Sequence, residues 1–99
     1  MNITKPTESG FTIYSKSGCP NCKNVKDMLI NKKCCFEVID CDDFLIEDKN
    51  AFLLFIKELA NKEVKQFPII FNNGTFIGGF IETQEYVDKL LSFGENLNF

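Results

Sequence analysis

The chain has 99 residues, 44% of them hydrophobic and 25% charged, with a formal net charge of −3. These proportions are typical of a globular protein and exclude a disordered or a membrane-spanning chain. The sequence contains no histidine and all 11 basic residues are lysines, which excludes histidine-dependent catalysis, histidine metal ligands and arginine fingers. The acidic balance argues against binding to nucleic acid.

The length of the chain allows one hydrophobic core, so we expect a single domain over residues 1–99. Within it, we expect an N-terminal extension at 1–10 and a C-terminal tail at 94–99. The first residues lack the apolar segment of a secretory signal, and no apolar run nears the roughly 20 residues that cross a bilayer. The five cysteines are an odd number in a chain without an export signal, which indicates a reducing compartment. We therefore expect a cytoplasmic protein with no membrane contact.

The pattern of apolar and turn-forming residues predicts seven elements in the order βαβαββα. In chain order these are a strand at 11–15, a helix at about 19–32, a strand at 35–40, a helix that begins near 48–50, strands at 66–71 and 75–78, and a helix from about 83 to 92 or 93. Pro20 fits the first turn of the first helix, where its missing N–H costs nothing. Asn72-Asn73-Gly74 between two apolar runs is a strong hairpin signal.

The last two helices have candidate caps and inward faces. Asp48 or Asn50 caps the second helix, and Thr83 caps the third, with Gly94 just past its end. The acidic stretch 40–48 is interpreted as a solvated loop. The apolar residues expected to face inward are Phe52, Phe55, Ile56 and Leu59 in the second helix and Tyr86, Val87, Leu90 and Leu91 in the third.

The order of the elements also predicts how the strands pair. A crossover through a helix makes the first two strands parallel, whereas the hairpin adds antiparallel neighbours. With helices on both faces, the expected fold is α/β, a four-stranded mixed sheet flanked by helices.

Cys19 and Cys22 form a C-x-x-C pair where the first strand ends and the first helix begins. At a helix N-terminus, free N–H groups and the positive end of the helix dipole favour a thiolate, so we expect the pKa of Cys19 to lie well below the ~8.5 of a free thiol. Lys16 and Lys23 would strengthen this effect. Cys22 lies one turn further on and faces the core, so we expect it to act second, as the resolving thiol.

C-x-x-C is also half of a zinc site, and Cys34, Cys35 and Cys41 could supply further thiolates. Against this alternative, Cys34 and Cys35 are adjacent and do not form a second C-x-x-C pair. Pro20 and the helical periodicity after it favour a redox site. Because a disulfide between adjacent residues is strained, we expect one of Cys34 and Cys35 to be buried and the other exposed. Inert buried cysteines are the third interpretation.

Three blocks occur in the order Tyr14 to Cys22, then Phe67-Pro68, then Phe76 to Gly79. In these blocks, and in the order of its elements, the sequence resembles the dithiol members of the glutaredoxin family, which has the thioredoxin-like fold. The resemblance extends from Phe11 to Phe93 and so covers nearly the whole chain.

The resemblance implies a glutathione-dependent thiol-disulfide oxidoreductase whose catalytic residues are Cys19 and Cys22. Such a protein reduces protein disulfides and glutathione mixed disulfides, with glutathione as the reductant and no metal. The resemblance also makes Pro68 a cis proline that faces the dithiol and leaves the backbone of Phe67 free to pair with a substrate backbone. The implied glutathione contacts are Lys16, Asn21, Lys65, Gln66, Phe67, Pro68, Gly79, Phe80 and Ile81.

The two ends of glutathione would meet different parts of this set. The resemblance places Lys16 and Lys65 near the glycine carboxylate. It places the γ-glutamyl end at Gly79, where a missing side chain allows close approach and the N–H groups of Phe80 and Ile81 can hold a carboxylate.

The chain departs from the family pattern at several of these positions. Asn21 stands where many relatives carry tyrosine, and Gln66 and Phe67 stand where threonine and valine are common. Ile81 occupies a position where a polar side chain often helps to hold the γ-glutamyl group, so only its backbone can do so here. These changes affect the affinity for glutathione more than the reactivity of the thiol.

The resemblance further implies a monomer with disulfide-containing protein substrates, ribonucleotide reductase among the candidates. Three alternatives stay open from the sequence. The first is a similar electron donor that thioredoxin reductase reduces, and the second is an iron-sulfur protein in which two subunits share a cluster. Pro20 beside Cys19 argues against the cluster. The third is a zinc-stabilised binding module.

Overall fold

The order of the elements is βαβαββα, as the sequence predicts. The computed structural model describes residues 2–96, with the backbone alone for 92–96. Its elements are β1 (Phe11–Ser15), α1 (Pro20–Asn31), β2 (Phe36–Asp40), α2 (Asp42–Ala60), β3 (Ile69–Asn72), β4 (Thr75–Gly78) and α3 (Phe80–Asn96). None of the helices in this part of the chain combines the length and the hydropathy that a bilayer crossing requires.

The four strands form one mixed sheet in the order β2-β1-β3-β4. β1 runs parallel to β2 and antiparallel to β3, with Ile13 opposite both Val38 and Ile70. β4 pairs antiparallel with β3 at the edge of the sheet. All five residues of β1 are buried, because this strand is central and both of its faces are covered. The predicted fold class is confirmed.

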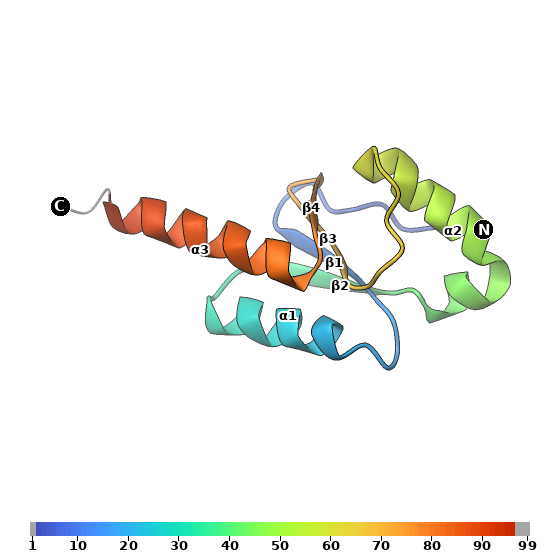
Figure 1. The fold of residues 1–99 in the computed structure, drawn as a ribbon, viewed down its shortest axis with the longest axis horizontal. Coiled ribbons are helices and arrows are strands. Elements are labelled where there is room, and N and C mark those ends of the chain that lie inside the picture. The colour runs from blue at the N-terminus through green and yellow to red at the C-terminus, as the bar shows by residue number, and fades with distance from the viewer. Residues whose placement is uncertain (1, 97–99) are drawn as a thin grey trace.

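The helices cover the two faces of the sheet unequally. Figure 1 shows α1 and α3 on one side and α2 on the other. On the first side, Val25 and Leu29 of α1 pack with Val87 of α3 against the sheet. On the second side, Phe52 and Ile56 of α2 pack against the opposite face. The apolar periodicity of the helices therefore forms two cores, with the sheet between them.

The core beneath α2 is rich in aromatic side chains. Phe52 is stacked between Phe44 and Phe67, with both ring centroid separations at 5.9 Å. Tyr14 contacts Phe52 edge to face, and its hydroxyl donates a hydrogen bond of 2.7 Å to the carbonyl oxygen of Thr4. The N-terminal extension is thus fixed to the body of the protein by a buried tyrosine.

The β3–β4 hairpin turns at the Asn-Gly pair that the sequence singles out. Asn73 and Gly74 both have positive φ, 52° and 81°, as a tight two-residue hairpin turn requires. The Asn73 side chain also accepts a hydrogen bond of 2.8 Å from the backbone N–H of Gly10. β3 begins at Ile69, so residues 66–68, which we expected to be part of the strand, precede it.

α2 begins earlier than the sequence predicts. The prediction of a solvated loop over 40–48 is wrong for residues 42–48, which are helical apart from a kink at Asp48 (φ −160°, ψ 85°). Asp42 and Asp43 in the first turn favour the helix because their charges oppose the positive end of its dipole. At the kink, the Asp48 carboxylate accepts a 3.0 Å hydrogen bond from the backbone N–H of Ala51, which is the capping contact predicted for Asp48.

α3 is longer at both ends than predicted. It begins at Phe80, before Thr83, and continues through Gly94 to Asn96. Residues 97–99 of the expected C-terminal tail lie outside the described residues. Leu90 and Leu91 were expected to face inward but are 51% and 40% exposed, because α3 extends beyond the edge of the sheet (Figure 1).

Leu59 likewise departs from the inward face predicted for α2. It is 37% exposed, whereas Phe52 and Ile56 are completely buried. Leu59 lies in the last turn of α2, one residue before the helix ends at Ala60.

Candidate active site at the start of α1

Cys19 and Cys22 are joined by a disulfide with a Cα–Cα separation of 5.3 Å. Cys19 is the N-cap of α1, in extended conformation, and its sulfur accepts a 3.2 Å hydrogen bond from the backbone N–H of Cys22. Cys22 is only 2% exposed, whereas Cys19 is half-buried. A nucleophile from solvent therefore reaches Cys19 more easily than Cys22, and Cys19 lies where the helix dipole stabilises negative charge.

The loop between β1 and α1 carries Cys19, and a residue of α2 holds this loop through hydrogen bonds. Gly18 has a φ of 73°, and a side chain there would meet no atom within 4 Å. Ser17 donates two hydrogen bonds to the Asp42 carboxylate, one from its backbone N–H at 2.9 Å and one from its hydroxyl. These hydrogen bonds, followed by the nearby charge of Lys16, hold the pKa of Asp42 below its usual range. Because the two residues are 25 positions apart, no local pattern in the sequence predicts this contact.

The Phe67-Pro68 peptide bond is cis, as the resemblance implies. The Phe67 ring is held on one side by its stack on Phe52. The ammonium group of Lys16 lies 5.6 Å from the centroid of the same ring. The loop before α1 and the loop before β3 therefore meet through a cation–π contact.

A cavity of about 490 Å³ opens between the 62–68 loop, β4 and the start of α3. Of the nine residues expected to contact glutathione, all except Lys16 line it. These eight are Asn21, Lys65, Gln66, Phe67, Pro68, Gly79, Phe80 and Ile81. Lys16 lines a smaller hollow with Ser17, Lys26 and Asp40 instead.

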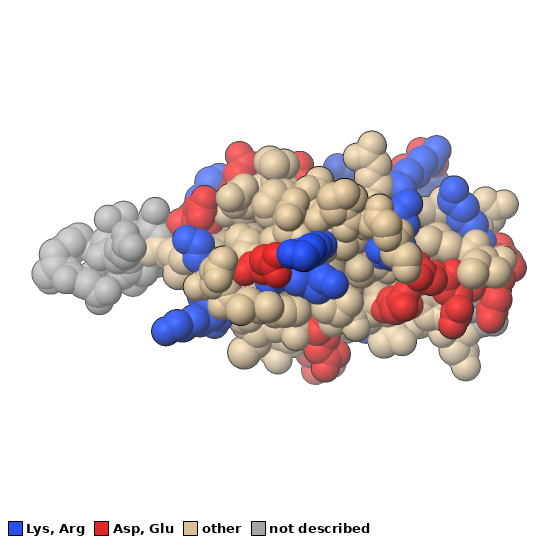
Figure 2. All heavy atoms as spheres, turned by 90° about the horizontal axis from the view of Figure 1, so that it is seen from below, with Lys and Arg blue, Asp and Glu red and all other residues tan. Residues whose placement is uncertain are grey.

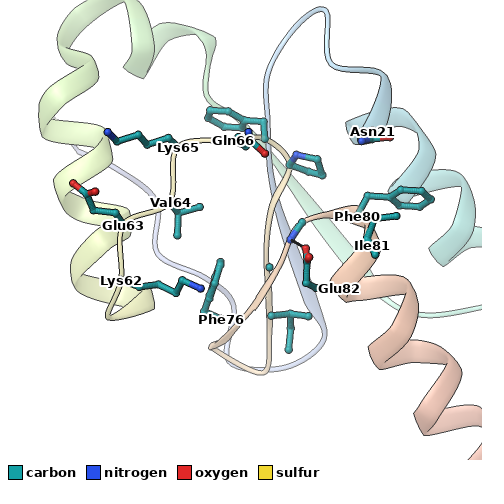
Figure 3. Close-up of a pocket in the computed structure, with 15 residues that line it drawn as sticks. Asn21, Lys62, Glu63, Val64, Lys65, Gln66, Phe76, Phe80, Ile81 and Glu82 are labelled. Carbon is teal, nitrogen blue, oxygen red and sulfur yellow. Dashed lines mark hydrogen bonds between the residues drawn. The ribbon is translucent and has the colours of Figure 1, made fainter.

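Lysines of the 62–68 loop point in different directions (Figure 3). Lys65 and Glu63 point toward α2, and both also line a second cavity beside that helix. Lys62 points toward Phe76, with its ammonium group 6.0 Å from the ring centroid. Both lysines line the cavity, whereas the resemblance in sequence points to Lys65 alone.

The start of α3 forms the opposite wall of this cavity. Figure 3 shows Glu82 reaching back along the helix start, where its carboxylate accepts a 2.8 Å hydrogen bond from the backbone N–H of Gly79. The backbone N–H of Thr83 donates to the carbonyl oxygen of Gly79 at 3.0 Å, which is the first hydrogen bond of the helix. Glu82 thus makes one half of a capping box, and Gly79 has no side chain to make the other half. The N–H groups of Phe80 and Ile81 lie in the first turn, where a helix offers donors to an anion.

The other cysteines lie apart from the disulfide. Cys41 is completely buried, and burial, followed by the charges of Asp40 and Asp42, raises its pKa to about 12 although a backbone hydrogen bond to Ser15 acts against this. Cys34 is half-buried and Cys35 exposed. Among residues 2–96, no three histidine, cysteine or acidic side chains gather closely enough to hold a metal ion.

Acidic side chains cluster near the active-site loop. Figure 2 shows negative charge gathered at one end of the molecule, and the acidic residues where β2 ends and α2 begins are Asp40, Asp42, Asp43, Glu47 and Asp48. On the neighbouring surface of α1, Lys23 pairs with Asp27 at 2.8 Å. The pair is exposed, so it contributes little to stability.

Known proteins are similar to this chain in both sequence and fold. The glutaredoxin family model matches residues 11–77. Glutaredoxin 1 of Rickettsia bellii is 33% identical over 94 residues, which cover 90% of this chain and 93% of that protein. Among solved structures, Glutaredoxin 1 from Francisella tularensis has a TM-score of 0.71 and 26% identity, covering 83% of this chain and 95% of its own. Reduced Escherichia coli glutaredoxin has a TM-score of 0.64 and 26% identity, covering 83% and 96%.

Proposed function

The chain belongs to the glutaredoxin family of glutathione-dependent thiol-disulfide oxidoreductases, and we propose that Cys19 is its attacking thiol and Cys22 its resolving thiol. The observation that carries this assignment is the position of Cys19 at the N-cap of α1, with Cys22 buried behind it. A helix N-terminus stabilises a thiolate, which favours Cys19 over Cys22 as the attacking thiol.

The reaction with a protein disulfide proceeds by two thiolate exchanges. The Cys19 thiolate attacks one sulfur of the substrate, forms a mixed disulfide and releases the other substrate sulfur as a thiolate, which takes up a proton. Cys22 loses its proton and attacks the sulfur of Cys19, which releases the second substrate thiol. The product is the Cys19–Cys22 disulfide that the structure contains.

Two glutathione molecules return the protein to the dithiol. The first attacks Cys19, frees Cys22 and leaves glutathione bound to Cys19 as a mixed disulfide. The second attacks the sulfur of that bound glutathione, which releases oxidised glutathione and the Cys19 thiolate. Reduction of a glutathione mixed disulfide on another molecule uses Cys19 alone, because glutathione is the only group transferred.

Glutathione lies in the cavity between the 62–68 loop and α3 in this proposal. The N–H groups of Phe80 and Ile81 hold its γ-glutamyl carboxylate, since they lie in the first turn of α3. Lys16 and Lys62 supply positive charge for its glycine carboxylate. The remaining contacts proposed are Asn21, Lys65, Gln66, Phe67, Pro68 and Gly79, which all line the cavity.

Further parts of the proposal rest on the sequence. Residues 1–99 act as one domain and as a monomer in the cytoplasm, where reduced glutathione is available and free thiols such as Cys35 persist. Disulfide-containing proteins are the substrates, with ribonucleotide reductase as one candidate. No metal takes part in the exchange.

Two substitutions test the assignment. We expect Cys19→Ser to abolish exchange with every disulfide, because serine supplies no thiolate. Cys22→Ser is expected to lose reduction of protein disulfides and to keep reduction of a glutathionylated peptide, which needs Cys19 alone. The exposed thiol Cys35 provides the matched control, and Cys35→Ser should behave as the unmodified chain. Activity that persists in Cys19→Ser would overturn the assignment.

A further inference from the structure

Asp42, the first residue of α2, is hydrogen-bonded to the loop that carries Cys19. The carboxylate of Asp42 accepts hydrogen bonds from both the backbone N–H and the hydroxyl of Ser17, which lies two residues before Cys19. Asp42 is itself fixed, because its backbone N–H donates to the Asp40 carboxylate at 3.0 Å. One turn-forming segment at the start of α2 thus holds the loop through a single side chain.

Apart from the cation–π contact of Lys16 with Phe67, the loop has few other constraints. Lys16, Ser17 and Gly18 are all exposed, and the space around Gly18 is open. Across residues 2–96, Asp42 supplies the side-chain hydrogen bonds that reach this loop. A short exposed segment with a glycine has considerable conformational freedom, and two hydrogen bonds to one carboxylate remove much of it.

We propose that Asp42 is a positioning residue of the redox centre, which fixes the Ser17 backbone so that Cys19 stays at the N-cap of α1. The inference rests on the proposed function, because it concerns the reactivity of Cys19 as the attacking thiol. Asp42 does not touch the reacting sulfur atoms in this role. It acts through Ser17. Because the Ser17 backbone is held in place, Cys19 stays at the N-cap, where the helix N-terminus stabilises its thiolate.

The charge of Asp42 acts in the opposite direction to its positioning effect. A carboxylate near Cys19 disfavours a second negative charge, so loss of that charge alone would make the Cys19 thiolate easier to form. The carboxylate is exposed and lies near the ammonium group of Lys16, which weakens its field at the sulfur. Positioning therefore outweighs charge in the proposal, and the two effects predict opposite changes in reactivity.

The test is the pH profile of Cys19 modification in the reduced full-length chain. Iodoacetamide reacts with the thiolate, and the mass of the peptide that contains Cys19 separates this reaction from those of the other thiols. We expect Asp42→Ala to lower the rate at about pH 6 by about three-fold and to move the profile to higher pH. Asp43→Ala is the matched control, because Asp43 is the exposed neighbour of Asp42, and it should leave the profile unchanged.

Asp42→Asn separates position from charge. Asparagine keeps an oxygen that can accept the Ser17 N–H but carries no charge. We expect this variant to react as fast as the unmodified chain or slightly faster. If Asp42→Ala also reacts as fast or faster, the carboxylate acts by its charge or not at all, and the positioning role is wrong.

Ser17→Ala removes one of the two hydrogen bonds and supplies a second line of test. We expect a smaller loss than in Asp42→Ala, and the double variant should lose no more than Asp42→Ala alone, because both act through the same contact. Additive losses would contradict the inference. Failure of the proposed function would appear in the unmodified chain itself, where Cys19 would react no faster than Cys35. Failure of this inference appears only in the comparison among variants.

Discussion

The two ends of α1 carry cysteines in opposite electrostatic surroundings. Cys19 caps the start of the helix and its sulfur faces the N–H groups of the first turn. Cys34 follows the end of the helix, where its backbone N–H donates to the carbonyl oxygen of Leu29 at 2.9 Å. The N-terminal end of a helix stabilises a thiolate, and the C-terminal end does not. We therefore expect position along the helix, and not residue type, to decide which of these cysteines reacts.

Solvation strengthens this contrast. Burial, followed by the neighbouring Cys35, raises the pKa of Cys34, although Lys32 acts in the other direction. The parallel pairing of β1 and β2 also places the two ends of α1 at opposite ends of these strands, so the 12 residues of α1 separate Cys34 from the Cys19–Cys22 pair. The disulfide partner of Cys19 in the structure is Cys22.

The largest expected effect is a difference in alkylation rate between the two ends of α1. At about pH 6.5, Cys19 of the reduced chain should react at least about ten-fold faster than Cys34, because its thiolate fraction is larger. Peptide masses after timed treatment with iodoacetamide measure both rates in one sample. The exposed Cys35 controls for access, since it is open to the reagent but lies away from the helix start. Equal rates at Cys19 and Cys34 would show that position along α1 does not set the reactivity of these thiols.

A smaller effect should separate Lys62 and Lys65, the two lysines of the 62–68 loop. Both lysines line the cavity, but Lys62 points toward Phe76 and Lys65 points toward α2, so Lys62→Ala should weaken binding of a glutathionylated peptide more (Figure 3). We expect KM to rise about three-fold for Lys62→Ala with little change in kcat, as is usual for an exposed charge at a binding site. Lys57→Ala provides a control of equal charge on α2, outside this cavity. A larger rise in KM for Lys65→Ala would show that the orientation of these side chains does not matter.

The smallest effect concerns Cys41. It lies beside the end of β1, where its backbone N–H donates to the carbonyl oxygen of Ser15, and it is buried. Burial raises its pKa to about 12 in the folded protein, whereas the ordinary value is 9.0. The unfolded chain therefore loses this proton at lower pH, so the contribution to stability is complete below about pH 9 and is lost as the pH rises toward 12.

Urea unfolding at about pH 8 and about pH 10 measures this loss. We expect the free energy of unfolding to fall between the two conditions and to fall less in Cys41→Ala, which has no thiol to ionise. An equal fall in both proteins would assign the pH dependence to other groups, such as Tyr14, whose pKa burial also raises.

Local signals in the sequence predicted most of the fold. The Asn-Gly pair places the hairpin, because few other residues adopt the positive φ values of that turn. Pro20 of the C-x-x-C pair likewise places the start of α1, because its fixed φ and missing N–H suit the first turn of a helix. The prediction failed for residues 42–48, where a run of acidic residues indicated a loop. Those side chains are largely exposed, but exposure does not exclude a helix whose first turn favours negative charge.

The inward faces of the helices were predicted less well near their ends. The spacing of Leu90 and Leu91 fits the apolar stripe of α3, yet both are exposed because the helix continues past the sheet. Spacing shows which residues share a face, but it does not show where the surface that covers this face ends.

The sequence by itself determined the chemistry of this protein, since a thiol pair at a strand-to-helix junction is a local feature and its reactivity depends on the adjacent helix start. The tertiary structure decided what surrounds that pair. The contact of Asp42 with Ser17 joins residues 25 positions apart, and the different directions of Lys62 and Lys65 depend on the path of a loop between α2 and the sheet. Such contacts form only when separate elements pack together, so no local pattern encodes them.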